Sequence, residues 1–105
     1  MEKVKTVMSP ASLAKIAEVV KTIGHPQRIE IIEVLRTFPS LTVHGIQEKM
    51  RTKIEQSLLS HHLIKMKDKG ILISNKEGSS VYYSIRVSDI LRLLECLENC
   101  SCHFT

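Results

Sequence analysis

Hydrogen-bonding side chains gather on one side of the segment from Thr52 to Gly70. The apolar residues Leu59, Leu63 and Met66 recur at the spacing of one helix face. Short polar side chains occupy the opposite side of the same helix: Gln56, Ser57, Ser60 and His61. Such groups can read the edges of DNA bases, and Gln can pair with both N6 and N7 of adenine. The alternative is an ordinary solvated helix face, and the residues around the segment have to decide between the two.

Basic residues surround this polar face. Phosphate contacts set the affinity and register of a DNA-binding protein, while base contacts set its sequence preference. We expect phosphate contacts from four residues: Arg51, Lys53, Lys67 and Lys76. The formal net charge of +4 favours an anionic partner. Double-stranded DNA is therefore the predicted partner.

Two short helices with a tight turn between them are predicted to position this polar face. Thr52 and Glu55 have the spacing of a capping box, which predicts a helix over residues 52–69. Thr42 is the predicted N-cap of a preceding helix whose inner face carries Val43, Ile46 and Met50. Residues 51–53 are too few for anything but a turn. Two helices joined in this way predict a helix-turn-helix.

Two longer helices precede this pair. Ser9 and Pro10 predict the start of the first, with Ser as N-cap and Pro at the first helical position. Gly24 is its expected end. The sequence His25-Pro26 predicts the start of the second helix, and Phe38-Pro39 its end, because the residue before proline disfavours helical geometry. The first helix has a wide apolar face, which predicts burial against a large partner such as a second subunit: Leu13, Ile16, Ala17 and Val20.

A β-hairpin and a final helix are predicted after Gly70. Residues 71–75 and 81–85 are two β-prone runs, and the glycine-containing loop 76–80 between them is typical of a hairpin. Directly after a helix-turn-helix, such a hairpin is a wing. Ser88 is the predicted N-cap of the last helix, with Asp89 in its first turn. This helix has its own apolar stripe: Ile90, Leu93, Leu94 and Leu97.

The predicted fold class is mostly α with a small β-hairpin: a winged helix-turn-helix of four helices, the hairpin and a fifth helix. A chain of 105 residues suits one core. We expect a single domain over residues 9–99, with dimerising end helices and flexible termini at 1–8 and 100–105. No signal peptide or run of about 20 apolar residues is visible, which predicts a cytoplasmic protein without membrane contact. Paired carboxylates, nucleophile motifs and phosphate loops are absent from the sequence, so we do not expect an enzyme.

Four segments resemble those of a known family, in the same order and spacing: Ile23–Ile29, Gln56–Leu63, Gly70–Leu72 and Val81–Ile85. Over about residues 13–98 the chain resembles the ArsR-type (ArsR/SmtB) bacterial transcriptional repressors. The resemblance implies a homodimer built from the first and last helices. It also implies that the two copies of helix 52–69 and wing 71–85 bind a pseudo-palindromic operator in successive major grooves.

The chain departs from the family's known metal sites. Metal-sensing members carry a Cys-x-Cys pair on the third helix, where this chain has Thr42 and His44. Another branch uses Asp-x-His followed by a distant His-x-x-His or Glu on the last helix. Asp89 matches the first of those ligands, but Leu91 and Cys102 stand where histidines would lie. We therefore predict neither of these metal sites and no resident cofactor.

Three cysteines near the C-terminus allow a different kind of sensor: Cys96, Cys100 and Cys102. Thiolates suit a soft ion such as arsenite, cuprous ion or zinc, and His103 would be a fourth ligand. Two of the thiols could instead form a disulfide and act as a redox switch. The alternative is that Cys96 and Cys100 flank the dimer seam as small apolar residues. The sequence leaves these possibilities open.

The two adjacent histidines are expected to differ in role. His61 shares the outer face with Ser57, whereas His62 lies beside the apolar stripe, where we expect a packed, hydrogen-bonded structural role. Ile64 stands on the outer face where the family often has lysine, and serines occupy the wing tip where arginines are common. These departures motivate a competing hypothesis, in which the winged helix contacts another protein without binding DNA sequence-specifically.

Overall fold

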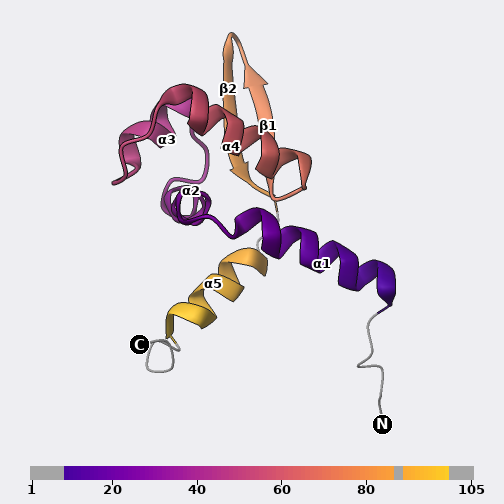
Figure 1. The fold of residues 1–105 in the computed structure, drawn as a ribbon. Helices are drawn as coiled ribbons and strands as arrows, with labels where there is room; N and C mark the ends of the chain where they lie inside the picture. The colour runs from indigo at the N-terminus through magenta and orange to yellow at the C-terminus, as the bar shows by residue number, and fades with distance from the viewer. Residues whose placement is uncertain (1–8, 87–88, 100–105) are drawn as a thin grey trace.

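The computed structural model describes residues 9–86 and 89–99 of the chain. The elements follow the predicted order: α1 (Pro10–Ile23), α2 (Pro26–Thr37), α3 (Val43–Lys49), α4 (Gln56–Asp68), β1 (Leu72–Glu77), β2 (Ser80–Ile85) and α5 (Asp89–Asn99). A helix-turn-helix followed by an antiparallel hairpin confirms the winged helix-turn-helix (Figure 1). The predicted Ser88 cap and the predicted flexible ends lie outside the described residues.

Local capping signals set the beginning of two helices as predicted. The amide of Ser12 donates to Ser9 Oγ at 3.1 Å, which caps α1, and Pro10 follows at the first helical position. The amide of Gly45 donates to Thr42 Oγ1, also at 3.1 Å, which caps α3. Each side chain satisfies a backbone N–H that the first turn of a helix leaves unpaired.

The predicted start of α4 at Thr52 is wrong. The helix begins at Gln56, and its N-cap Glu55 is extended and makes no side-chain capping hydrogen bond. The physical reason is the burial of Ile54, which is 8% exposed and belongs to the core. Residues 52–55 remain outside the helix while Ile54 packs inward, so a tertiary contact overrides the local capping-box signal.

The core lies where α2, α3, α4 and the base of the hairpin meet. Ile31 and Ile32 of α2 are completely buried, as the apolar character of that helix predicts. Aliphatic side chains, two methionines and Tyr83 fill the remainder. Seven side chains define its centre: Leu35, Ile46, Leu59, Leu63, Met66, Ile71 and Leu72. Burial of this apolar surface is the main favourable contribution to folding, and it fixes α4 against α2 and α3.

The hairpin is longer and its turn tighter than predicted. β1 and β2 pair from Leu72 with Ile85 to Glu77 with Ser80, which leaves a two-residue turn instead of the expected five-residue loop. Gly78 occupies the first turn position with φ of 63°, a conformation that favours glycine. Backbone hydrogen bonds in both directions between Leu41 and Tyr83 also attach the hairpin to the segment before α3.

The two end helices lie at the opposite end of the molecule from the tip of the hairpin (Figure 1). On α1, Leu13, Ile16 and Val20 are 46–52% exposed, although they are aliphatic. Leu97 on α5 is 46% exposed as well. Arg36 of α2 forms an ion pair with Glu95 of α5 at 3.3 Å. Within residues 9–86 and 89–99, no helix has the length and apolar character needed to cross a membrane.

Candidate nucleic-acid interface

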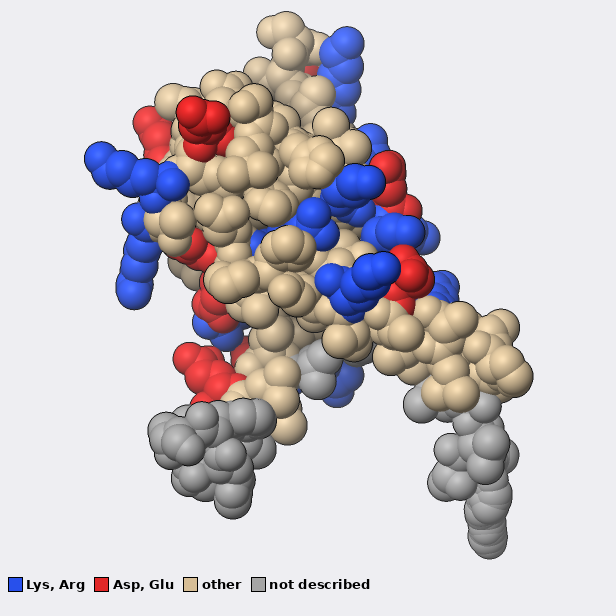
Figure 2. Space-filling model, viewed as in Figure 1, with Lys and Arg blue, Asp and Glu red and all other residues tan. Residues whose placement is uncertain are grey.

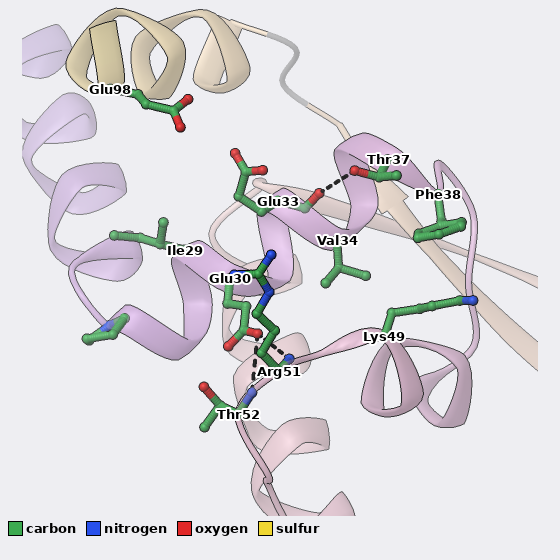
Figure 3. Close-up of a pocket in the computed structure, with 11 residues that line it drawn as sticks. Ile29, Glu30, Glu33, Val34, Thr37, Phe38, Lys49, Arg51, Thr52 and Glu98 are labelled. Atoms are coloured by element: carbon green, nitrogen blue, oxygen red, sulfur yellow. Dashed lines mark hydrogen bonds between the residues drawn. The ribbon is translucent and has the colours of Figure 1, made fainter. Parts of the chain in front are cut away.

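The connection between α3 and α4 is held in place by Glu30 of α2. Its Oε2 accepts hydrogen bonds from the backbone amides of Arg51 at 2.5 Å and Thr52 at 3.3 Å (Figure 3). Burial raises the pKa of Glu30, but hydrogen bonds from the Thr52 side chain and both amides, with the charge of Arg51, outweigh burial and lower it overall. The carboxylate therefore stays ionised and fixes the chain just before the polar helix.

A second side chain holds the end of the same connection. Gln47 of α3 donates from Nε2 to the carbonyl oxygen of Ile54 at 2.8 Å. The Ile54 side chain is buried in the core. Ile54 is therefore held twice, through the hydrogen bond to its backbone and through the packing of its side chain. These contacts determine where the first turn of α4 projects from the surface.

A network of hydrogen bonds centred on His62 attaches the middle of α4 to the neighbouring helices. Arg28 Nε donates to His62 Nδ1 at 2.9 Å, and His62 Nε2 lies 3.0 Å from Gln27 Oε1. Since the guanidinium can only donate, Nδ1 is the acceptor and Nε2 carries the proton. Arg28 also donates to the carbonyl oxygen of Thr22 in α1 at 2.9 Å, so the network joins three helices.

His62 is neutral in this arrangement. Burial lowers its pKa below the usual value, and the positive charge of Arg28 lowers it further. The imidazole is 5% exposed, which confirms the expected packed structural role. Its neighbour His61 is exposed on the outer side of α4, also as predicted.

The outer face of α4 carries the predicted base-contacting residues. Gln56 and Ser57 lie exposed in the first turn, and Ser60 is half-buried in the next turn, beside the exposed His61. The N-terminal part of a recognition helix is the part that contacts base edges in helix-turn-helix proteins. The structure therefore brings all four side chains to the outer surface of α4, three of them exposed and Ser60 half-buried.

The predicted phosphate-binding residues surround this surface. Arg51 and Lys53 are exposed on the connection before α4, Lys67 is exposed in its last turn, and Lys76 is exposed near the tip of the wing. A helix of 13 residues is about 20 Å long, so these groups are spread widely rather than clustered. Figure 2 shows Lys and Arg side chains at the wing tip, beside the end of α3, and over α4 and the adjoining part of α1.

One lysine next to this surface is already neutralised. Lys69 Nζ lies 3.0 Å from Glu18 Oε1 of α1. The hydrogen bond from Lys69, followed by its charge, lowers the pKa of Glu18. This ion pair joins α1 to the C-terminal end of α4, so Lys69 is a poorer candidate for phosphate contact than Lys67.

Gly70 directs the chain from α4 into the wing. The amide of Ile71 donates to the Met66 carbonyl at 2.9 Å, and the amide of Gly70 donates to the Lys67 carbonyl at 3.0 Å. These two bonds form a Schellman motif, which requires a left-handed residue, and Gly70 has φ of 80°. The motif fixes the angle between the polar helix and the wing.

Sequence reasoning did not identify three of the residues that position this surface: Glu30, Gln47 and Leu41. Each acts through a backbone group, and the partners of Glu30 and Leu41 are 21 or more positions away. Because backbone groups are the same in every residue, nothing in the sequence marks them as partners. Only the packing of α2 and the hairpin against the helix pair reveals the contacts of Glu30 and Leu41, and only the path of the connection between α3 and α4 reveals that of Gln47.

The predicted thiol cluster is only partly described. Cys96 is a free, exposed thiol on α5, while Cys100, Cys102 and His103 lie outside the described residues. Thr42 caps α3, and His44 pairs with Glu48 at 3.1 Å, so both positions have other roles. In the part of the chain that the structure describes, no group of three or more His, Cys, Asp or Glu residues could hold a metal ion.

A helix-turn-helix with an exposed polar second helix, flanked by basic side chains and a wing, defines a winged helix-turn-helix DNA-binding regulator. Comparison with known proteins then identifies the family. Residues 25–74 match the model of the arsR family of bacterial regulatory proteins. The transcriptional repressor PagR of Bacillus anthracis is 38% identical over 90 residues, covering 83% of this chain and 88% of PagR. The chain therefore belongs to the ArsR family, as its sequence resemblance predicted.

Solved structures agree with this assignment. The crystal structure of PagR aligns with a TM-score of 0.75 at 34% sequence identity, over 85% of this chain and 99% of that one. The homodimeric winged helix-turn-helix domain Mb0332 from Mycobacterium bovis, a possible ArsR-family regulator, aligns with a TM-score of 0.77 over 95% of this chain and 93% of its own. At 22% identity, the second comparison supports the fold alone.

Proposed function

We propose that this protein is a cytoplasmic, homodimeric transcriptional repressor that binds a pseudo-palindromic operator. The observation that carries the proposal is the exposed polar surface of α4, held by buried contacts and flanked by basic residues. In this proposal four residues contact base edges: Gln56, Ser57, Ser60 and His61. Arg51, Lys53, Lys67 and Lys76 contact phosphates, so the wing and the helix-turn-helix bind the same duplex. A protein of this kind blocks transcription by occupying the promoter.

The proposed dimer uses the exposed apolar residues of the end helices. Leu13, Ile16 and Val20 follow one another at helical spacing and so share one face of α1. Fully burying such a side chain gains about 1.5–3 kcal/mol, so each half-exposed residue gains roughly 1 kcal/mol in an interface. A two-fold interface uses every residue twice, which makes this face a substantial contribution to association.

The direct test is selection of binding sites from random duplex DNA by the purified protein, followed by footprinting. We expect two inverted half-sites whose centres are about one helical turn apart, roughly 34 Å. A dimer that neutralises some 6–10 phosphates should lose about 10³–10⁵ in affinity between 50 and 200 mM salt. Failure to enrich any sequence at low salt, with a protein shown to be folded and dimeric, would contradict the proposal.

The competing function is protein binding without sequence-specific DNA recognition, and the exposed aliphatic side chains on α4 and the wing favour it. A double variant, Gln56→Ala with Ser60→Ala, separates the two functions. Both side chains lie on the outer surface, so the fold should survive, and circular dichroism checks that it does. DNA binding predicts that operator affinity and repression are lost together. Repression that persists after operator affinity is lost would favour the protein-binding function.

Thiol sensing at Cys96, Cys100 and Cys102 remains a hypothesis, with arsenite, zinc or another soft metal ion, or oxidation, as its effector. Titrating the reduced protein with Zn²⁺ and with arsenite, and then oxidising it, should change operator affinity if the thiols act as a sensor. The triple Cys→Ser variant is the matched control, because it should lose the response and retain basal DNA binding. Unchanged affinity in every titration would leave these cysteines as ordinary residues beside the dimer seam.

A further inference from the structure

Ile64 interrupts an otherwise polar row on the outer face of α4. Ser57, Ser60, Ile64 and Lys67 follow one another at intervals of three and four residues, so their side chains form one line along the helix. With a rise of 1.5 Å per residue, Ile64 lies about 10 Å beyond Ser57 along the axis. It is therefore a continuation of the surface that carries the proposed base contacts.

The protein itself does not explain the presence of isoleucine here. Its side chain is 51% exposed, and it is neither in the core nor among the partly buried residues that pack against the core. The apolar face of α1 that is proposed for the dimer does not account for it either, because Ile64 lies on the outer face of α4, in the row with Ser57 and Ser60. A half-exposed aliphatic side chain at this position is suited to contact an apolar group of a bound partner.

The major groove offers one such feature. Thymine presents its C5-methyl group there, and apolar side chains distinguish thymine from cytosine by contact with it. We infer that Ile64 contacts a thymine methyl group in each operator half-site and thereby determines part of the sequence preference. The inference rests on the proposed function, since it requires α4 to lie in the major groove.

The last turn of α4 carries charges of both signs. Lys65 and Lys67 are basic and exposed there, and Asp68, which follows Ile64 by one turn, is exposed as well. Lys67 ends the row and can contact a backbone phosphate. Ile64 is therefore the last residue of the row that the inference assigns to a base edge.

The test combines a change in the protein with a change in the DNA. Replacing thymine by uracil removes only the C5-methyl group, so each thymine of the selected operator is replaced in turn, symmetrically in both half-sites. Affinities of the wild type and Ile64→Ala are measured by fluorescence anisotropy at one salt concentration. Burial of a methyl group predicts a loss of about fourfold per half-site for the wild type at one thymine position. Ile64→Ala should bind the thymine and uracil operators equally at that position.

The control is Leu58→Ala. Leu58 is 43% exposed on the same helix but lies away from the row, so this variant should keep the wild-type sensitivity to uracil. Wild-type binding that is insensitive to every uracil replacement, or an Ile64→Ala variant that remains sensitive, would overturn the inference while the proposed function stands. Failure of the protein to select any operator would overturn both.

Discussion

Replacing His62 by leucine tests whether its polar network holds α4 against α2 and α1. Leucine fills similar space but cannot accept the hydrogen bond from Arg28 or donate one to Gln27. A hydrogen bond to a charged group contributes about 1.5–3 kcal/mol and a neutral one about 0.5–1.5 kcal/mol. Both partners are half-buried, so water compensates in part. We expect the free energy of unfolding to fall by about 2–3 kcal/mol.

The same substitution should also remove part of the pH dependence of stability. His62 has a lowered pKa in the folded protein, because it is buried and faces the cation Arg28. Below the unfolded pKa of about 6.5, the unfolded chain therefore binds more protons at this position than the folded chain does. Wild-type stability should decrease as the pH falls below about 6.5. In His62→Leu this contribution is absent, so the variant should lose less stability over the same range.

The assay is urea unfolding followed by circular dichroism, at pH 7.5 and pH 5.5 and at a single protein concentration, because dimer stability depends on concentration. His61→Leu is the matched control: His61 is exposed on the same helix, so its replacement should change the free energy of unfolding by less than about 0.5 kcal/mol. A His62→Leu variant within about 0.5 kcal/mol of the wild type, or with the same pH dependence, would refute the reasoning.

Three further substitutions test the anchors of the site and the dimer. Glu30→Ala removes the acceptor of two backbone hydrogen bonds, so it should lower the free energy of unfolding in urea by about 1 kcal/mol and weaken operator binding. Glu55→Ala is the control: Glu55 makes no side-chain capping bond, so its replacement should lower the free energy of unfolding by less. Equal effects of the two would contradict the anchoring role. Ile16→Asp places a charge in the proposed interface, so sedimentation should show monomers with unchanged helix content; a persistent dimer would exclude this face. Gly70→Ala forces a residue with a side chain into a left-handed conformation, so it should lower the free energy of unfolding by about 1 kcal/mol. An unchanged free energy of unfolding would show that this backbone conformation is not strained for alanine.

Local interactions explain why so much of the fold could be predicted from the sequence. Ser9 and Thr42 cap helices through amides three residues away, and Gly70 ends α4 through bonds within the same turn. Apolar periodicity also predicted that His62 lies beside the core and His61 on the outside. Helix caps and periodicity are both contained in a few consecutive residues, so they can be recognised in the sequence. The family resemblance depends on the same ordered segments.

Tertiary structure decided what those local signals could not. Thr52 and Glu55 have the spacing of a capping box, which predicts a helix start at Thr52. Because Ile54 is buried in the core, residues 52–55 are not helical and the helix begins at Gln56. Glu30 anchors the connection from a different helix, through backbone amides that no sequence pattern marks. The sequence by itself therefore determined which elements form and which face of α4 is polar. The packing of α2 and the hairpin determined where that face begins and how it projects, because those contacts join residues far apart in the chain.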